Sequence, residues 1–138
     1  MVLSSNKAQG DYGEAKFLTR IIGLGYNASI PFGDREKYDL IVDVGGNLNR
    51  VQVKTVNDYD KSDLKNRNLS RYKVRCRDSR DKQYTPDDCD MIACLIIPEG
   101  IWYIIPMAEG CPLNLVLNPK SARKSKYDKF REAWDLFL

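Results

Sequence analysis

Two short apolar runs, joined by a tight turn, constrain the fold of this chain more than any other feature. The first run covers residues 91–97 and the second covers residues 101–105, with Pro98-Glu99-Gly100 between them. Apolar runs of this length, bounded by turn residues, are typical of buried strands. We therefore expect a buried strand pair, in which Ile96, Ile101 and Ile104 belong either to the core or to an interface between subunits.

The patterns before and after these runs predict an α/β domain. After a loose tail over residues 1–8, apolar residues at helical spacing predict a helix that ends near Leu24. We expect strands over residues 27–31, 38–44, 49–56, 70–77 and 113–117, with a hairpin turn at Gly45-Gly46-Asn47. A closing helix is expected over residues 125–137, burying Tyr127, Phe130, Trp134 and Phe137. This order of elements predicts a single domain over residues 1–138, with a mixed β-sheet flanked by helices.

The cysteines and the apolar segments indicate where the protein is located. The chain has four cysteines without Cys-x-x-Cys spacing, and its first 17 residues lack the apolar segment of a secretory signal. We therefore expect reduced thiols in the core and an intracellular protein, either cytoplasmic or associated with the nucleoid. No membrane partner is expected, because the longest apolar run is too short to span a bilayer.

The absence of histidine excludes several kinds of chemistry. It rules out Ser-His-Asp and Cys-His catalysis, zinc sites that contain histidine, and histidine as a general base. Any reaction must therefore use carboxylates, lysine, hydroxyls, thiols or a metal held by oxygen atoms.

The net charge of +3 conceals two strongly basic blocks. Residues 61–82 contain nine Lys and Arg against three Asp, and residues 120–131 contain six against one. The rest of the chain therefore carries a net charge of −8. This distribution suits a protein that binds a polyanion and holds cations near it, although two ordinary solvated faces would also produce it.

The hairpin over residues 38–56 holds a set of polar residues that could perform chemistry. Gln52 and Lys54 share one face of their strand, and antiparallel pairing can bring Asp39 beside them. Oxygen atoms of Asp39, Gln52 and the Val53 carbonyl would suit Mg²⁺, as in a phosphodiesterase. Lys54 could then orient or deprotonate a water molecule, or stabilise charge on the phosphate. An exposed aspartate and lysine on an ordinary hairpin would give the same pattern.

Short motifs spread over nearly the whole chain carry a family resemblance. They are Gly13-Glu14, Pro31-Phe32-Gly33-Asp34, Tyr38-Asp39-Leu40, Val51-Gln52-Val53-Lys54-Thr55, Trp102-Tyr103-Ile104-Ile105-Pro106 and Ser125-Lys126-Tyr127. In these motifs the chain resembles the PD-(D/E)XK nuclease superfamily and, more narrowly, its group I intron-encoded homing endonucleases. The resemblance implies a restriction-endonuclease-like core. It also implies a site-specific endonuclease that hydrolyses double-stranded DNA with Mg²⁺, for which Mn²⁺ is the expected substitute.

Two residues depart from the superfamily pattern. Tyr38 stands where proline is usual, and Gln52 replaces the second carboxylate, as it does in the intron-encoded subgroup. We expect Glu14 to supply the missing charge as a catalytic residue and metal ligand, the alternative being a solvated helix glutamate. Thr55 either contacts a phosphate or simply fills a strand position.

Cations outside the hairpin are the candidates for contact with DNA. The strand over residues 70–77 alternates apolar and basic residues, which gives one cationic face that can enter a major groove. The candidates on this face are Arg71, Lys73, Arg75 and Arg77. Those expected to bind the DNA backbone are Lys61, Lys65 and Arg67, with Lys120, Arg123, Lys124 and Lys126 in the second block.

The proposed activity constrains the assembly, and other activities stay open. One site cuts one strand, so we expect a homo-oligomer, at least a dimer, and the resemblance suggests a tetramer. The alternatives are a Holliday-junction-resolvase-like nuclease, a DNA-binding module with a decayed site, and a structural domain whose basic faces are incidental.

Overall fold

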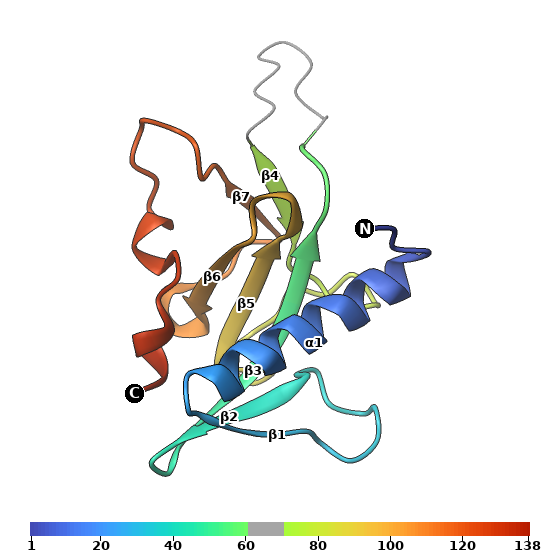
Figure 1. The fold of residues 1–138 in the computed structure, drawn as a ribbon, viewed down its shortest axis with the longest axis vertical. Coiled ribbons are helices and arrows are strands. Elements are labelled where there is room, and N and C mark those ends of the chain that lie inside the picture. The colour runs from blue at the N-terminus through green and yellow to red at the C-terminus, as the bar shows by residue number, and fades with distance from the viewer. Residues whose placement is uncertain (61–70) are drawn as a thin grey trace.

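A mixed sheet of five strands forms the centre of the molecule (Figure 1). The computed structural model describes residues 1–60 and 71–138. The strand order is β1-β2-β3-β5-β6. β3 runs parallel to β5, and the other neighbouring strands are antiparallel. The strands are β1 (Asn27–Ser29), β2 (Leu40–Val44), β3 (Asn47–Val56), β5 (Met91–Ile96) and β6 (Ile101–Pro106).

Two layers cover this sheet, one on each face. The helix α1 (Asn6–Gly23) crosses one face (Figure 1). On the other face, a small antiparallel sheet pairs β4 (Tyr72–Arg75) with β7 (Asn114–Leu117). The predicted α/β class with a mixed sheet at its centre is confirmed.

The layers on both faces of the sheet explain why residues 91–97 form an apolar run. All six residues of β5 are buried, and they alternate between two core clusters. Ile92 and Ile96 belong to the cluster beside β4 and β7, whereas Ala93 and Leu95 belong to the cluster beside α1. Because β5 is covered on both faces, it has no polar alternation.

The strand pair β5–β6 belongs to the core of the chain itself. Ile96 and Ile104 are fully buried and Ile101 is partly buried. The core alternative is therefore correct for these residues, and the interface alternative is not supported. The connection is the short 3₁₀ turn η1 (Ile97–Glu99), which ends at Gly100 with a φ of +64°.

The helix α1 begins earlier than its apolar spacing indicates. Its first residue is Asn6, and the Ser5 side chain caps it by accepting a hydrogen bond from the Ala8 N–H at 3.0 Å. The predicted loose tail is thus wrong for residues 6–8, because polar residues carry the helix back to a serine cap.

Gly13 allows α1 to lie unusually close to β3. A Cβ atom at this position would overlap Cγ2 of Thr55, whereas a Cβ at Gly10 would meet nothing within 4 Å. One turn earlier, the Gln9 side chain donates a hydrogen bond to Thr55 Oγ1 at 3.0 Å. Thr55 therefore faces α1, and the missing side chain of Gly13 sets the distance between helix and sheet.

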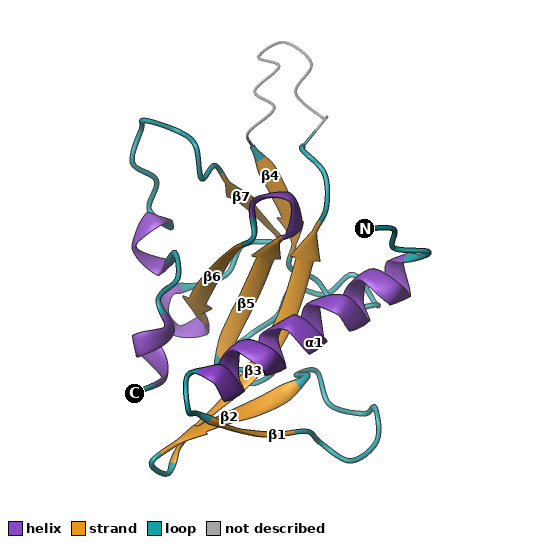
Figure 2. Cartoon of the chain, viewed as in Figure 1, coloured by secondary structure: helices purple, strands orange, loops and turns teal. Residues whose placement is uncertain are grey.

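The predicted closing helix over residues 125–137 is wrong. The segment contains two short 3₁₀ turns, η3 (Asp128–Phe130) and η4 (Trp134–Phe137), as Figure 2 shows. Between them Glu132 has a φ of +51°, which a continuous helix does not allow. The four aromatic side chains are nevertheless buried as predicted: Tyr127, Phe130, Trp134 and Phe137.

Tertiary hydrogen bonds explain why this segment is not one helix. The Glu132 N–H donates to the Trp102 carbonyl at 2.8 Å, and its carboxylate accepts from the Trp102 N–H at 3.1 Å. The same carboxylate accepts from the Trp134 indole at 2.6 Å and pairs with Arg20 at 3.2 Å. These bonds attach the segment to the edge of β6 and replace the hydrogen bonds of a helix.

The cysteines lie in the core, as predicted. Cys76, Cys89, Cys94 and Cys111 are all free and buried. In the parts of the chain that the structure describes, every helix is too short or too polar to cross a membrane.

The contact at Gly13 gives a stability prediction. We expect Gly13→Ala to lower the free energy of unfolding by about 1–3 kcal/mol, because the added methyl group overpacks the interface between α1 and β3. Gly10→Ala, on the open side of the same helix, should raise it by up to about 1 kcal/mol through helix propensity. Urea unfolding monitored by circular dichroism measures both. Equal stability of the two variants would contradict the close approach.

Candidate active site

The site lies where β3 continues beyond Leu40, the first residue of β2. The pairing between these strands ends at Leu40 and Val51, after which the Asp39 N–H donates to the Val51 carbonyl at 2.8 Å. Val53 points its backbone groups toward the same edge, because strand residues repeat every two positions. Its N–H donates to the Asp39 carboxylate at 2.8 Å. The Val53 N–H, which has no partner in β2, therefore fixes the position of the Asp39 carboxylate.

Gln52 and Lys54 lie on the opposite face of β3 from Val53, as the alternation predicts. Val53 packs in the core beside α1, whereas Gln52 and Lys54 are half-buried. The Gln52 amide donates to the Val53 carbonyl at 3.3 Å. The side chain of Gln52 thus turns back toward the edge at which Asp39 lies.

The ammonium group of Lys54 has two partners from the segment that follows β4. Its Nζ donates to the Arg77 carbonyl at 3.2 Å and lies 4.9 Å from the centroid of the Tyr84 ring. Burial lowers the pKa of Lys54, while the nearby Cys76 and Asp39 act in the opposite direction. Lys54 is consequently held in one place and loses a proton more readily than a solvated lysine.

Glu14 reaches the site from α1, next to Gly13. Its carboxyl group shares a hydrogen bond with that of Asp39. Burial, followed by this hydrogen bond and the charge of Asp39, raises the pKa of Glu14 to about 7. The two carboxyl groups therefore lie close together, and Glu14 keeps its proton to a higher pH than a solvated glutamate does.

One cleft of about 550 Å³ lies between α1, β3 and the segment after β4. Its walls include Glu14, Asp39, Gln52, Val53 and Lys54, which are the five residues predicted to perform chemistry or bind metal. The structure thus brings together residues from α1, β3 and the end of β2. The solvated-glutamate alternative for Glu14 is not supported.

The side chains of β4 alternate between the core and the surface. Tyr72, Val74 and Cys76 are buried, and Lys73 and Arg75 between them are exposed, so the predicted alternation is confirmed. Strand pairing in β4 itself ends at Arg75, two residues earlier than expected.

These cations do not all point toward the cleft. Arg75 and Arg77 line it, and both form ion pairs with Asp81. Arg71 instead pairs with Asp60 at 3.2 Å. The row of cations predicted from alternation is therefore divided, and only its later part borders the site.

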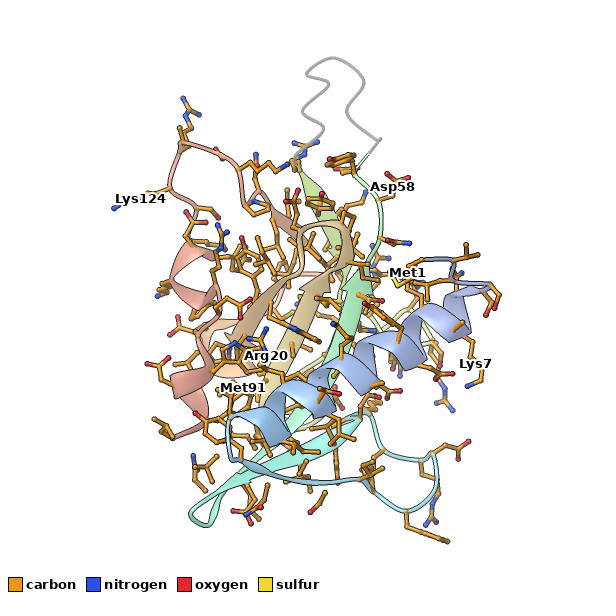
Figure 3. All side chains as sticks on the ribbon, in the orientation of Figure 1. Met1, Lys7, Arg20, Asp58, Met91 and Lys124 are labelled. Carbon is orange, nitrogen blue, oxygen red and sulfur yellow. The ribbon has the colours of Figure 1, made fainter. Side chains whose placement is uncertain are left out.

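Lys124, another candidate for DNA contact, does not line the cleft. Lys124 is exposed in the connection between β7 and η3, which is a loop rather than the start of a helix. Figure 3 places it on the opposite side of the molecule from Lys7, which lines the cleft. Lys61, Lys65 and Arg67 lie outside the described residues.

Sequence reasoning missed several residues that shape the cleft. Gln9 lies one helical turn before Gly13, so a reading of the helix face could have found it. Tyr84 and the Arg77 carbonyl approach Lys54 only through the path of an irregular segment. No periodicity in the sequence indicates that contact.

The donor set suits a hard divalent cation such as Mg²⁺. Among residues 1–60 and 71–138, no three His, Cys, Asp or Glu side chains gather to hold a metal. The cleft offers instead two carboxyl groups, an amide and a backbone carbonyl: Glu14, Asp39, Gln52 and Val53. Mg²⁺ commonly binds one or two carboxylates and keeps several waters, so these residues fit it. The strongest structural support for this fit is that the carboxyl groups of Glu14 and Asp39 come from different elements and line the same cleft.

Comparison with known proteins agrees with the geometry. The family model described as PD-(D/E)XK endonuclease matches residues 4–137. The solved structure of the bacterial homing endonuclease I-Ssp6803I is similar to this chain, with a TM-score of 0.80 and 28% sequence identity. The similarity covers 97% of this chain and 91% of that chain. No curated protein matches the sequence.

The carboxyl pair predicts a specific pH dependence of stability. Between the ordinary pKa of 4.5 and the folded value of about 7, the folded protein keeps a proton on Glu14 that the unfolded chain releases. Raising the pH through this range therefore costs the wild type stability. Glu14→Gln removes this cost, so its melting temperature should rise relative to wild type as the pH increases from 5 to 8 in EDTA.

The control for this measurement is an isolated carboxylate. Glu109→Gln, at an exposed position in the turn η2 (Met107–Glu109), should keep a constant difference from wild type over the same pH range. If the difference in melting temperature between Glu14→Gln and wild type stayed constant over this pH range, the raised pKa of Glu14 would be contradicted.

Proposed function

The chain belongs to the PD-(D/E)XK endonuclease family, which makes it a nuclease, and we propose that it cuts double-stranded DNA at a specific site with a divalent metal. The observation that carries this proposal is the cleft in which the Glu14–Asp39 carboxyl pair lies beside Lys54. The similarity to a homing endonuclease supports a homing-type activity for this chain.

The roles of the site residues follow from their surroundings. Glu14, Asp39, Gln52 and the Val53 carbonyl would hold Mg²⁺, or Mn²⁺ in its place. The bound ion would supply a water of lowered pKa and neutralise charge on the phosphate oxygens. The Val53 N–H keeps Asp39 oriented, and Glu14 would give up its proton on binding a cation.

Lys54 is the residue that we assign to the reacting phosphate. Its side chain lines the cleft, and its ammonium group lies between the Arg77 carbonyl and the Tyr84 ring. There it can stabilise the charge that develops on the phosphate, and its lowered pKa also suits the transfer of a proton from water. None of these roles requires histidine.

Charges around the cleft support a nucleic-acid substrate. Arg75 and Arg77 border it, and Lys73 is exposed on β4 beside them. Guanidinium groups bind phosphate in a bidentate manner and can read guanine in a major groove. We assign this face to the DNA that leads into the cleft.

The assembly and location follow from the activity. One site cuts one strand, so a double-strand cut needs at least two copies of the chain, and we propose a dimer or tetramer. An enzyme that cuts genomic DNA would act inside the cell, in the cytoplasm or at the nucleoid.

The decisive test of this function removes the charge of Lys54. Lys54→Met should lower the rate of duplex cleavage in Mg²⁺ by about 100-fold or more, because the developing charge loses its partner. Its affinity for the same duplex should stay within a few-fold of wild type. The target is first obtained by selecting cleaved sites from a randomised duplex library.

Lys129→Met is the matched control, since Lys129 is exposed within η3 and outside the cleft. It should cut like wild type. Binding without cleavage in Mg²⁺ or Mn²⁺ would contradict the proposal and favour a decayed DNA-binding module. Cleavage of four-way junctions regardless of sequence would favour a resolvase.

The basic face gives a second prediction, in terms of salt. Lys73→Ala, in an inactive Lys54→Met background, should weaken binding to all duplexes by a similar factor. The slope of log affinity against log salt should become shallower by about 0.9, the value of one phosphate contact. Fluorescence anisotropy measures the slope, and Lys129→Ala serves as the control that leaves it unchanged. An unchanged slope in the Lys73 variant would mean that Lys73 does not contact a DNA phosphate, and would contradict the assignment of this face to DNA.

A further inference from the structure

The position of Lys54 depends on a segment distant in sequence from β3. Its Nζ donates to the Arg77 carbonyl at 3.2 Å and lies 4.9 Å from the centroid of the Tyr84 ring. Both partners belong to the stretch between β4 and β5. The ammonium group therefore lies between β3 and this stretch, with a hydrogen-bond acceptor and an aromatic ring as its neighbours.

Tyr84 differs from the residues around it. Gln83, Thr85 and Pro86 are exposed, whereas Tyr84 is only 6% exposed and joins the core cluster beside β4 and β7. The segment thus turns one side chain inward, and this side chain is the one that contacts Lys54.

Hydrogen bonds hold Tyr84 in place from both sides. Before it, Gln83 forms a β-bridge with Arg77, and its amide donates to the Cys111 carbonyl. After it, the Thr85 N–H donates to the Asp88 carboxylate at 2.9 Å. The ring is consequently a rigid surface against which a flexible lysine can be placed.

An aromatic ring at this position has a specific physical effect. The face of the ring attracts a cation, and the attraction grows as water is excluded. Lysine has a flexible stem with three N–H donors, so one hydrogen bond alone leaves its head group free to rotate. With one donor on the Arg77 carbonyl and the ring beside it, the remaining donors are free for the cleft.

We propose that Tyr84 is a positioning residue that aims the Lys54 ammonium group into the cleft through the face of its ring. The expected effect of Tyr84 on cleavage rests on the proposed nuclease function. The contact between Tyr84 and Lys54 can be tested without any cleavage. Since the effect comes from the ring, the hydroxyl is dispensable.

Three variants test this role through cleavage. Tyr84→Leu and Tyr84→Met remove the ring, and Tyr84→Phe keeps it. We expect single-turnover cleavage to fall by about 10- to 100-fold for Leu and Met, as for a misplaced catalytic group, with unchanged duplex affinity. Tyr84→Phe should stay within threefold of wild type.

Tyr127→Leu is the matched control for lost packing. Tyr127 is also buried in the same core cluster, and its ring neighbours Lys126 rather than Lys54. Its loss should lower the melting temperature without the selective loss of cleavage rate. Equal cleavage by Tyr84→Met and wild type, with both folded, would overturn the proposal.

Nuclear magnetic resonance tests the contact independently of activity. Protein carrying ¹³Cε-lysine is compared with Lys54→Arg to assign the Lys54 ε-methylene signal. Ring current from Tyr84 should shift these protons upfield in wild type and Tyr84→Phe, and the shift should vanish in Tyr84→Met. An unshifted signal in wild type would overturn the proposal even if the ring-deleted variants did not fold. The expected shifts in a protein that cuts no duplex would instead contradict only the nuclease function.

Discussion

The unequal length of β2 and β3 is the constraint on which the rest of the site depends. Where β2 ends, β3 continues with its backbone groups directed toward an edge that has no neighbouring strand. A buried backbone N–H needs an acceptor, and the Val53 N–H finds it in the Asp39 carboxylate. A requirement of sheet geometry thereby fixes an acidic side chain next to the Val53 carbonyl, which has no partner in β2. The other groups of the cleft are arranged around this point.

Those groups arrive from both layers that cover the sheet. Gly13 brings α1 close enough for Glu14 to meet Asp39, and the segment after β4 brings Arg77 and Tyr84 to Lys54. The two faces of β3 therefore have separate tasks, since Val53 and Thr55 pack under the helix while Gln52 and Lys54 face the opposite layer. Two adjacent carboxyl groups on one side and a half-buried lysine on the other are both costly to place away from water. Such costs are typical of sites that serve function rather than stability.

Much of this arrangement could be predicted from the sequence, because it depends on local periodicity. The alternation in β3 placed Gln52 and Lys54 on one face, and the apolar run at β5 placed that strand in the centre. The closing helix could not be excluded in the same way, since the aromatic spacing around Trp134 fits a helix equally well. Only hydrogen bonds between Glu132 and Trp102 decide against it, and they join residues that are distant in sequence. The contact between Lys54 and Tyr84 could not be predicted either, because it too joins residues that are distant in sequence.

The attachment of the C-terminal segment to β6 limits how copies of this protein can associate. The bonds from Glu132 to Trp102, and the bridge between Arg131 and Tyr103, occupy backbone groups that an edge strand would otherwise present. At the opposite edge, β1 has only three residues, which is too little to template a neighbouring strand. In the part of the chain that the structure describes, both outer strands of the main sheet therefore offer few unpaired backbone groups for strand addition. Side-chain surfaces are thus better suited than these outer strands to contact a second copy, and the cleft is built from residues of one copy alone.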